Sequence, residues 1–437
     1  MIFRSIATIA ALCTLTAPAH AIEIEQVTSP GGITAWLVPD DSIPFVALSI
    51  QFRGGASLDP EGKRGAVNLM AATLEEGAGD MDATQFAQAV EALGARASFD
   101  AGADTVSVTA RALTENRDEA AELLRLALSQ PRFDAEAVDR VRAQVLAVIR
   151  ADETDPGTIA SLALMRKVWG DHPYGSSING TAESVAALTP DDLREAASRT
   201  LARDRVIVGA AGDITAAELG PLLDHILGDL PETGSAPLPP PASYQANGGA
   251  EIIDWDSPQT VIRFAQPGIA MDDPDYFAAY IANHILGGGG FSSRLMDEIR
   301  EQRGLTYGVS SGLSNGLFGD VWAGGLATAN ATAGQAMDLV RDTWARLAGG
   351  GVTEQELADA KTYLTGEYPL RFDGNGQIAA ILSGMQLIGM PIDYPNFRND
   401  LVEAVTLDDV ARVTRERLQP EALQFVLVGR PEGVSED

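Results

Sequence analysis

Apolar and polar positions repeat along the chain with two periods, one typical of helices and one typical of strands. Apolar residues recur every three or four positions over residues 135–150 and again over 354–364, which predicts two amphipathic helices. Over residues 97–111 apolar and polar positions alternate on both sides of Gly102, which predicts a hairpin. Because the predicted strands come in hairpins and the helices come in runs, the predicted fold class is α+β, with helices packed on a mainly antiparallel sheet.

The two halves of the chain repeat the same order of elements. Residues 45–52 and residues 260–264 each read as a strand, and each strand is followed by Gly, then Asp-Pro, then a helix. Residues 188–193 and 405–410 give matching ends, in which a Thr is placed to cap a helix whose first turn carries two aspartates. Matching beginnings and endings at corresponding places indicate a duplication, so we expect two homologous halves.

A segment rich in Pro, Gly and Ser, residues 231–250, separates these halves. It has few large apolar residues and its proline run is stiff and extended, so it reads as a linker. We therefore predict an N-terminal domain over residues 22–230 and a C-terminal domain over residues 251–437.

The N-terminus, residues 1–21, has the pattern of a secretory signal peptide. Arg4 gives a positive start, residues 6–15 are apolar, and Ala19-His20-Ala21 forms an A-x-A cleavage site. A retained anchor is the alternative, but the apolar run is shorter than the roughly 20 residues that span a bilayer. We expect export to the periplasm or secretion, without a membrane span. The single cysteine, Cys13, would leave with the signal, so the exported chain would have no disulfide.

The net charge of the chain limits the kinds of partner that it can bind. It contains 31 Lys and Arg against 61 Asp and Glu, for a formal net charge of −30. Such a surface repels phosphate backbones, which argues against binding to nucleic acid. It also argues against docking on anionic lipid.

Several motifs follow one another in an order that resembles the pitrilysin/insulinase family of zinc peptidases. They are His172-Pro173-Tyr174-Gly175, then Gly180-Thr181 with Glu183-Ser184, then Gly304-Leu305-Thr306-Tyr307-Gly308-Val309, and finally residues 366–382. The likeness is to the mitochondrial-processing-peptidase branch and extends over most of the chain. It implies two homologous halves that form half of a clamshell chamber, a peptide substrate, and a zinc site of the form H-x-x-E-H with a further glutamate on a later helix.

The positions that would hold zinc in such a peptidase carry other residues here. In that family two histidines four apart on one helical face bind zinc, the glutamate between them polarises the bound water, and the later glutamate completes the ligand set. The resemblance places these positions, in that chain order, at Asn68, Ala71, Ala72 and Val148. Asn is a poor zinc ligand and Ala and Val cannot bind zinc, so we expect no metal cofactor in this chain.

No other residues in the sequence form a substitute metal site. After the predicted signal peptide the histidines are His172, His225 and His284, and none lies four residues from another. The first lies in a loop motif and the others lie on predicted helices, so we expect structural roles. Glu75 and Glu76 are adjacent and point to different faces of a helix, which favours solvated charges.

Arg300 and Tyr307, seven residues apart, match a pair that the family supplies from its C-terminal half. The resemblance implies that this pair reaches the zinc-bound substrate. A guanidinium and a phenol can both donate hydrogen bonds to the oxyanion that forms when water attacks a peptide carbonyl. The alternative is a surface arginine at a helix end and a tyrosine packed on a strand. Arg303 is a competing arginine, and the spacing favours Arg300.

Four consecutive glycines, Gly287, Gly288, Gly289 and Gly290, are a second candidate site. A helix stop needs one or two glycines, so four indicate mobility or a close approach of a ligand to the backbone. The non-catalytic processing-peptidase subunit has a glycine-rich loop at a similar place, which implies a role in substrate binding. No Gly-Lys-Ser/Thr follows, so this is not a phosphate-binding loop.

These observations predict a non-catalytic subunit of a heteromeric zinc metallopeptidase. A zinc-bearing partner of the same family would carry the H-x-x-E-H helix, and this chain would add Arg300, Tyr307 and part of the substrate chamber. The first alternative is a proteolytically silent scaffold or peptide-binding protein, which has no need of the Arg/Tyr pair. The second is a free-standing hydrolase with a different site, against which the shortage of histidine and cysteine argues.

Overall fold

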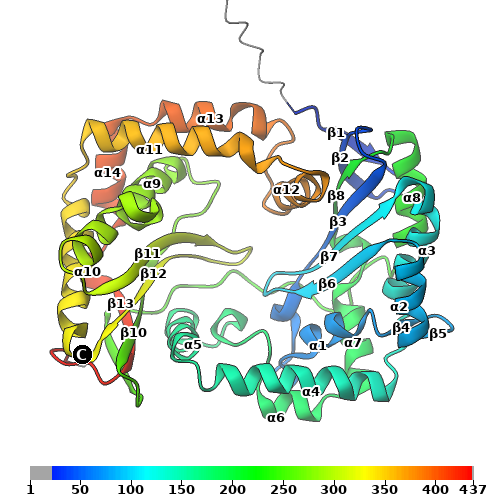
Figure 1. Ribbon diagram of the computed structural model, residues 1–437, viewed down its shortest axis with the longest axis horizontal. Coiled ribbons are helices and arrows are strands. Elements are labelled where there is room, and N and C mark those ends of the chain that lie inside the picture. Colours follow the sequence, from blue (N-terminus) through cyan, green and yellow to red (C-terminus); the bar gives the residue numbers. More distant parts are fainter. Residues whose placement is uncertain (1–21, 436–437) are drawn as a thin grey trace, which may run out of the picture.

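Two β-sheets, one in each half of the chain, form the centre of the fold (Figure 1). The structure is a computed structural model that describes residues 22–435, so the predicted signal peptide lies outside the described residues. The first sheet comprises, in spatial order, β1 (Glu25–Thr28), β2 (Thr34–Pro39), β8 (Val206–Gly212), β3 (Phe45–Arg53), β7 (Thr105–Leu113) and β6 (Arg96–Ala101). The second comprises β11 (Thr306–Asn315), β12 (Asp320–Ala329), β10 (Gln259–Pro267), β13 (Gln424–Gly429) and β9 (Gly249–Asp254). Strands β4 (Gly77–Ala78) and β5 (Met81–Asp82) form a small hairpin.

The two sheets share one topology, as a duplication requires. From its edge at β6 the first sheet runs β6-β7-β3-β8-β2, and from its edge at β11 the second runs β11-β12-β10-β13-β9. In each sheet the last two of these strands are parallel, and the other neighbouring pairs are antiparallel. The fold is therefore α+β with two homologous halves, as predicted, and β1 is an additional edge strand of the first half.

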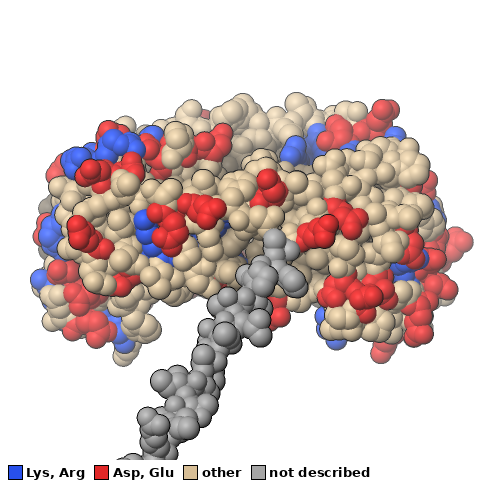
Figure 2. All heavy atoms as spheres, turned by 90° about the horizontal axis from the view of Figure 1, so that it is seen from above, with Lys and Arg blue, Asp and Glu red and all other residues tan. Residues whose placement is uncertain are grey.

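Helices cover both sheets. Those encoded in the first half are α1 (Ala66–Thr73), α2 (Ala83–Ala92), α3 (Arg117–Ser129), α4 (Ala135–Asp152), α5 (Pro156–Trp169), α6 (Ala182–Ala187), α7 (Pro190–Thr200) and α8 (Ala216–Leu227). Those encoded in the second are α9 (Tyr276–Asn283), α10 (Ala333–Ala348), α11 (Glu354–Glu367), α12 (Asn375–Leu387), α13 (Tyr394–Ala404) and α14 (Leu407–Arg417). Thr189 caps α7 and Thr406 caps α14, as expected from the matching half-ends. Within residues 22–435 no helix has both the length and the apolar composition that crossing a bilayer requires. On the face of the molecule seen in Figure 2, acidic side chains are spread more widely than basic ones.

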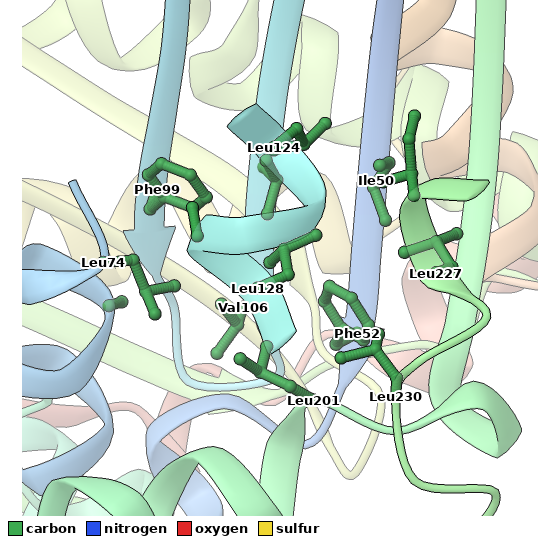
Figure 3. Close-up of a cluster of buried hydrophobic side chains, with 14 of the residues drawn as sticks. Ile50, Phe52, Leu74, Phe99, Val106, Leu124, Leu128, Leu201, Leu227 and Leu230 are labelled. Carbon is green, nitrogen blue, oxygen red and sulfur yellow. The ribbon is translucent and has the colours of Figure 1, made fainter. Parts of the chain in front are cut away.

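The core of the first half lies between one face of its sheet and the helices α3 and α8. Figure 3 shows Leu124 and Leu128 of α3 and Leu227 of α8 beside Ile50 and Phe52 of β3. All five side chains are buried. Because full burial of one such side chain contributes about 1.5–3 kcal/mol, this layer fixes the sheet against its helices.

The core of the second half is built around two tryptophans. The ring centroids of Trp322 on β12 and Trp344 on α10 lie 5.7 Å apart. Each indole N–H is satisfied, since Trp344 Nε1 donates to Gln266 Oε1 (2.7 Å) and Trp322 Nε1 donates to Asn283 Oδ1 (2.9 Å). Large rings can therefore be buried here without leaving a polar group unpaired.

Helix α5 belongs to the first half in sequence but packs on the second sheet. Its residues Leu164 and Val168 form a buried cluster with Val426 and Val428 of β13. The sequence pattern, which predicts one domain over residues 22–230, does not show this crossing.

Helix α12 makes the reciprocal crossing and packs on the first sheet. A Cβ atom at Gly209 of β8 would lie 2.1 Å from Ala379 O of α12, so helix and strand are in backbone contact. Ser383 on the same helix shares a 2.7 Å hydrogen bond with Ser49 of β3. Each sheet is thus covered on one face by a helix from the other half.

The tips of two hairpins meet between the halves, where β6–β7 and β11–β12 point toward one another (Figure 1). The hydroxyl of Tyr174 donates to Asp104 Oδ1, at the first tip, and accepts from Phe318 N at the second (3.0 Å). Asp104 Oδ2 also accepts from Leu317 N (2.9 Å). Next to Tyr174, His172 accepts from Tyr174 N through Nδ1 and lies 3.1 Å from Pro240 O through Nε2, which is the expected structural role.

Candidate functional site

Helix α1, which carries three of the four lost zinc positions, begins at a buried carboxylate. Asp59 accepts hydrogen bonds from the backbone N–H groups of Gly65 (2.8 Å) and Val67 (3.0 Å). Burial raises the pKa of Asp59 to about 6, although these two hydrogen bonds favour the charged form. These two hydrogen bonds hold the start of α1 to Asp59 whether or not the helix binds a metal.

The four lost zinc positions differ in their exposure. Asn68 and Ala72 lie one turn apart on a partly exposed face of α1, whereas Ala71 is 1 % exposed. Val148 lies on α4 and is 49 % exposed. Within residues 22–435 no three His, Cys, Asp or Glu side chains are grouped so that they could hold a metal ion. The side-chain chemistry of Asn68, Ala71, Ala72 and Val148 does not fit a zinc site.

A chain of polar side chains joins α1 to α4 at this place. Asn68 Nδ2 donates to Asn179 Oδ1 (3.1 Å), and Asn179 Nδ2 donates to Asp152 Oδ2 (3.1 Å). Asn179 comes from the turn before α6, three residues after Ser176. Sequence reasoning missed Asn179 and Asp152, because neither stands at a position of the zinc motif.

Arg300 lies in a π-helical segment, Met296–Glu301, and is one-third exposed. Its guanidinium pairs with the carboxylate of Glu301 and lies over the ring of Phe291, 4.7 Å from the centroid. The pair with Glu301 is solvent-exposed and joins sequence neighbours, so it is weak. The guanidinium is therefore held in place yet available to a stronger acceptor.

Tyr307 projects from an irregularity at the start of β11. The ladder pairs Thr306 with Thr328 and next pairs Val309 two residues back on β12, so β11 contains one extra residue at Tyr307 and Gly308. Such bulges redirect a side chain away from the sheet. Tyr307 is 92 % exposed. The alternative of a tyrosine packed on the strand is wrong.

The four-glycine run is more ordered than a simple loop. Gly287 and Gly288 end a π-helical turn over His284–Gly288, and a short 3₁₀ turn over Gly290–Ser292 follows. Gly290 has a φ of +59°, which a side chain rarely adopts.

Gly287, Gly288 and Gly289 are explained by contacts inside the chain, whereas a Cβ atom at Gly290 would meet nothing within 4 Å. A Cβ atom at Gly287 would lie 2.5 Å from Ser311 Oγ on β11, and one at Gly289 would lie 3.1 Å from His284 Nε2. The backbone thus lies directly on its neighbours. A role in substrate binding stays a prediction for this run.

The remaining histidines have protein partners. His225 Nε2 lies 3.0 Å from Glu122 Oε2. His284 is half-buried, stacks on Tyr363 with 5.0 Å between ring centroids, and has its pKa lowered by burial. These are structural roles, but the exposed ring of Tyr363 was not singled out by any sequence pattern.

Glu75 and Glu76 follow α1 and were expected to be solvated. Glu76 pairs with Arg140 of α4, and burial raises the pKa of Glu75. Neither carboxylate faces a histidine with which it could bind a metal.

Models of one peptidase family match the two halves of the chain. The model described as "Insulinase (Peptidase family M16)" matches residues 36–182, and the one described as "Peptidase M16 inactive domain" matches residues 187–364. A solved structure of a peptidase M16 inactive domain from Pseudomonas fluorescens is 30 % identical, with a TM-score of 0.87 over 95 % of this chain and 99 % of that one.

Some curated relatives are named as peptidases, and one is named as a non-peptidase homolog. The non-peptidase homolog YmxG of Helicobacter pylori is 27 % identical over 88 % of this chain and 89 % of its own length. An uncharacterized zinc protease of Streptomyces coelicolor is 27 % identical over 93 % and 90 %. A probable mitochondrial-processing peptidase subunit beta of Schizosaccharomyces pombe is 28 % identical over 70 % and 69 %.

Fold, motifs and relatives agree on one class. The chain belongs to the insulinase (M16) family of peptidases. The four positions expected to bind zinc carry Asn68, Ala71, Ala72 and Val148, and this composition agrees with a non-catalytic member of that family.

Proposed function

We propose that this chain is the non-catalytic subunit of a heteromeric zinc metallopeptidase. A partner of the same family carries the H-x-x-E-H helix and the zinc. This chain contributes Arg300 and Tyr307 to the partner's active site and forms part of the chamber that holds a peptide substrate. Export through the signal sequence would bring both subunits to the periplasm or the exterior.

One observation carries the proposal: the zinc positions are lost, while the Arg/Tyr pair is retained and Tyr307 is turned out of the sheet. A tyrosine that is 92 % exposed contributes nothing to the core of this chain. The bulge presents the Tyr307 hydroxyl to the outside, where another molecule can reach it. A substrate bound at a partner's zinc is such a molecule.

The chemistry of the pair suits this role. Water activated by the partner's zinc would attack the scissile carbonyl, whose oxygen then gains negative charge. The phenol of Tyr307 and the guanidinium of Arg300 would each donate a hydrogen bond to that oxygen. Neither group needs to change its protonation state.

A proteolytically silent scaffold is the second candidate. The observation that favours it is the engagement of Arg300, whose guanidinium already pairs with Glu301 and covers Phe291. In that case the aromatic and basic groups would serve peptide binding alone.

Co-expression decides between the two. The chain is produced with a family member that carries H-x-x-E-H, and peptide cleavage is measured for each subunit alone and for the mixture, with and without a chelator. Chelator-sensitive cleavage that needs both subunits supports the proposal. Equal cleavage by the zinc-bearing subunit alone would leave this chain as a scaffold.

A further inference from the structure

A cavity of about 500 Å³ lies where α4, α5 and the loop before α6 meet, and we name it the α4–α5 cavity. Helix α4 ends at Asp152 and α5 begins at Pro156, and the chain changes direction between them (Figure 1). The volume falls within the range of about 300–1,000 Å³ that small-molecule sites occupy. The α4–α5 cavity is therefore large enough to hold a ligand of its own.

Part of the lining of the α4–α5 cavity is apolar, because two helices present apolar side chains to it. Ile149 of α4 and Ile159 and Leu162 of α5 are among the lining residues. Another face of α5, which carries Leu164 and Val168, is buried against the second sheet. Helix α5 is thus fixed by one face while a different face lines the cavity. The apolar lining can cover a hydrocarbon side chain of a ligand.

Two arginines line the α4–α5 cavity without an acidic partner. Among the described residues no carboxylate forms an ion pair with Arg64 or Arg166, although the charge of Arg64 lowers the pKa of nearby Asp59. Elsewhere in the chain arginines are commonly paired, as Arg412 is with Asp275 (2.6 Å). Acidic residues outnumber Lys and Arg by 61 to 31, so carboxylates are not scarce. Both guanidinium groups are therefore available to a carboxylate that a ligand brings.

Two carboxylates of α4 and its end line the same cavity. Asp152 accepts from Asn179 Nδ2 through Oδ2 (3.1 Å), and its Oδ1 has no hydrogen-bond partner among the described residues. Glu153 is exposed and forms no ion pair within residues 22–435. The wall is held in place, since Ser184 Oγ donates to the backbone carbonyl of Arg64 (2.8 Å). The cavity thus presents groups of both signs beside an apolar surface.

We propose that the α4–α5 cavity binds a small zwitterion with an apolar side chain, which is either a free apolar amino acid or a dipeptide. Arg64 and Arg166 donate hydrogen bonds to its carboxylate. Asp152 and Glu153 accept from its ammonium group, and its side chain covers the apolar lining. The inference goes beyond the proposed function and does not depend on it, because all of these groups belong to this chain.

The direct test is ligand binding by the full chain alone, measured by isothermal titration calorimetry. The probes are L-leucine, L-leucyl-L-leucine, and the same dipeptide with its amino group acetylated, its carboxylate amidated, or both. A free zwitterion should bind, and each blocked terminus should weaken binding by about tenfold, because a charge-assisted hydrogen bond is then lost. The tighter of leucine and the dipeptide identifies which of the two the cavity takes.

Two variants assign the termini to their partners. Arg166→Ala should weaken the free zwitterion by about tenfold and leave the amidated dipeptide unchanged, because that probe has no carboxylate. Glu153→Gln should weaken the free zwitterion and leave the acetylated dipeptide unchanged. Both side chains are exposed, so both variants should fold, which circular dichroism checks. Arg150→Ala is the matched control, since Arg150 is an exposed arginine of α4 that does not line the cavity.

Three results would overturn the inference. The first is that the wild type binds neither leucine nor the dipeptide. The second is that the doubly blocked dipeptide binds as tightly as the free one, since the charged groups of the cavity then have no part in binding. The third is that Arg166→Ala and Glu153→Gln bind the free zwitterion as the wild type and Arg150→Ala do.

Discussion

Asn68 on α1 donates a hydrogen bond to Asn179 (3.1 Å), and Asn179 in turn donates a hydrogen bond to Asp152 at the end of α4 (3.1 Å). These two helices carry all four positions of the family's zinc site. The resemblance implies a zinc ion between the corresponding helices of a zinc-bearing relative, whereas amide side chains connect α1 and α4 here. The lost metal site has thus become a structural contact.

Asn179→Ala should destabilise the chain. The variant removes both hydrogen bonds and leaves Asn68 without this acceptor, at a cost of about 1–2 kcal/mol. Thermal or denaturant unfolding measures the change. Asn247→Ala in the exposed linker is the control and should change stability little. Equal stability of Asn179→Ala and the wild type would show that the side-chain link contributes nothing.

We expect zinc to bind to this chain only after two histidines are introduced into α1. Zinc should leave the melting temperature of the wild type unchanged, because its four positions offer no ligand set. Asn68→His/Ala72→His places two imidazoles one turn apart on the partly exposed face of α1, so zinc should raise its melting temperature. Scanning calorimetry with and without zinc tests both statements. A zinc-dependent rise in the wild type would contradict the assignment of a lost site.

Arg300→Ala and Tyr307→Phe should slow the assembled peptidase. Loss of one oxyanion donor typically lowers turnover by about 10²–10³. Both variants should fold and associate as the wild type does, since both side chains are exposed or partly exposed. Steady-state kinetics of the complex give kcat for each.

Arg303→Ala is the control for loss of positive charge. Arg303 pairs with Glu298 at 2.6 Å and should affect turnover far less. If kcat of the complex is unchanged in Tyr307→Phe, the hydroxyl of Tyr307 has no part in turnover, and only its ring can have a role.

Substitution by alanine should change the stability of the chain in opposite directions at two glycines, one that contacts helix α12 and one within it. At Gly209 of β8 the new Cβ would lie 2.1 Å from Ala379 O, so Gly209→Ala should destabilise by about 1–3 kcal/mol. At Gly384, within α12, a Cβ has open space, so Gly384→Ala should stabilise by about 0.5–1 kcal/mol. Urea unfolding of the two variants checks the signs. A Gly209→Ala variant that is as stable as the wild type would mean that α12 does not pack on β8 as described.

Stability should depend on pH through Asp59. Its pKa is raised from 3.8 to about 6, so the folded state holds this proton more tightly than the unfolded state. This contribution to stability is fully present below about pH 4 and is lost as pH rises through about 6. Between these limits the wild type should lose about 1–3 kcal/mol relative to Asp59→Asn, which does not titrate. Parallel pH dependence of unfolding in the two proteins would contradict this.

Local patterns predicted the elements and the duplication. The caps at Thr189 and Thr406 and the hairpin at Gly102 depend on residues a few positions apart, so the sequence displays them directly. The crossing of α5 and α12 could not be read in the same way. Periodicity shows that a helix has an apolar face, but it does not show which of two similar sheets that face covers.

The candidate site was predictable in composition and not in geometry. The positions of Asn68, Val148, Arg300 and Tyr307 follow from the resemblance. The exposure of Tyr307 depends on one extra residue in β11, which no local signal marks. The stacking of Tyr363 of α11 on His284 was likewise not predictable, because it is a contact between segments far apart in the sequence.

The crossing helices make each half incomplete without the other. Cleavage of a peptide bond within the exposed segment 231–248 would produce two fragments. These fragments would stay bound, because α5 still packs on the second sheet and α12 on the first. Either fragment made alone would expose the sheet face from which its covering helix had been withdrawn, and such a face favours aggregation. The duplicated halves are therefore an obligate pair joined by exchanged segments, and the linker itself contacts both halves, since Gln245 N donates to Val168 O of α5 and Ala242 N donates to Phe318 O between β11 and β12.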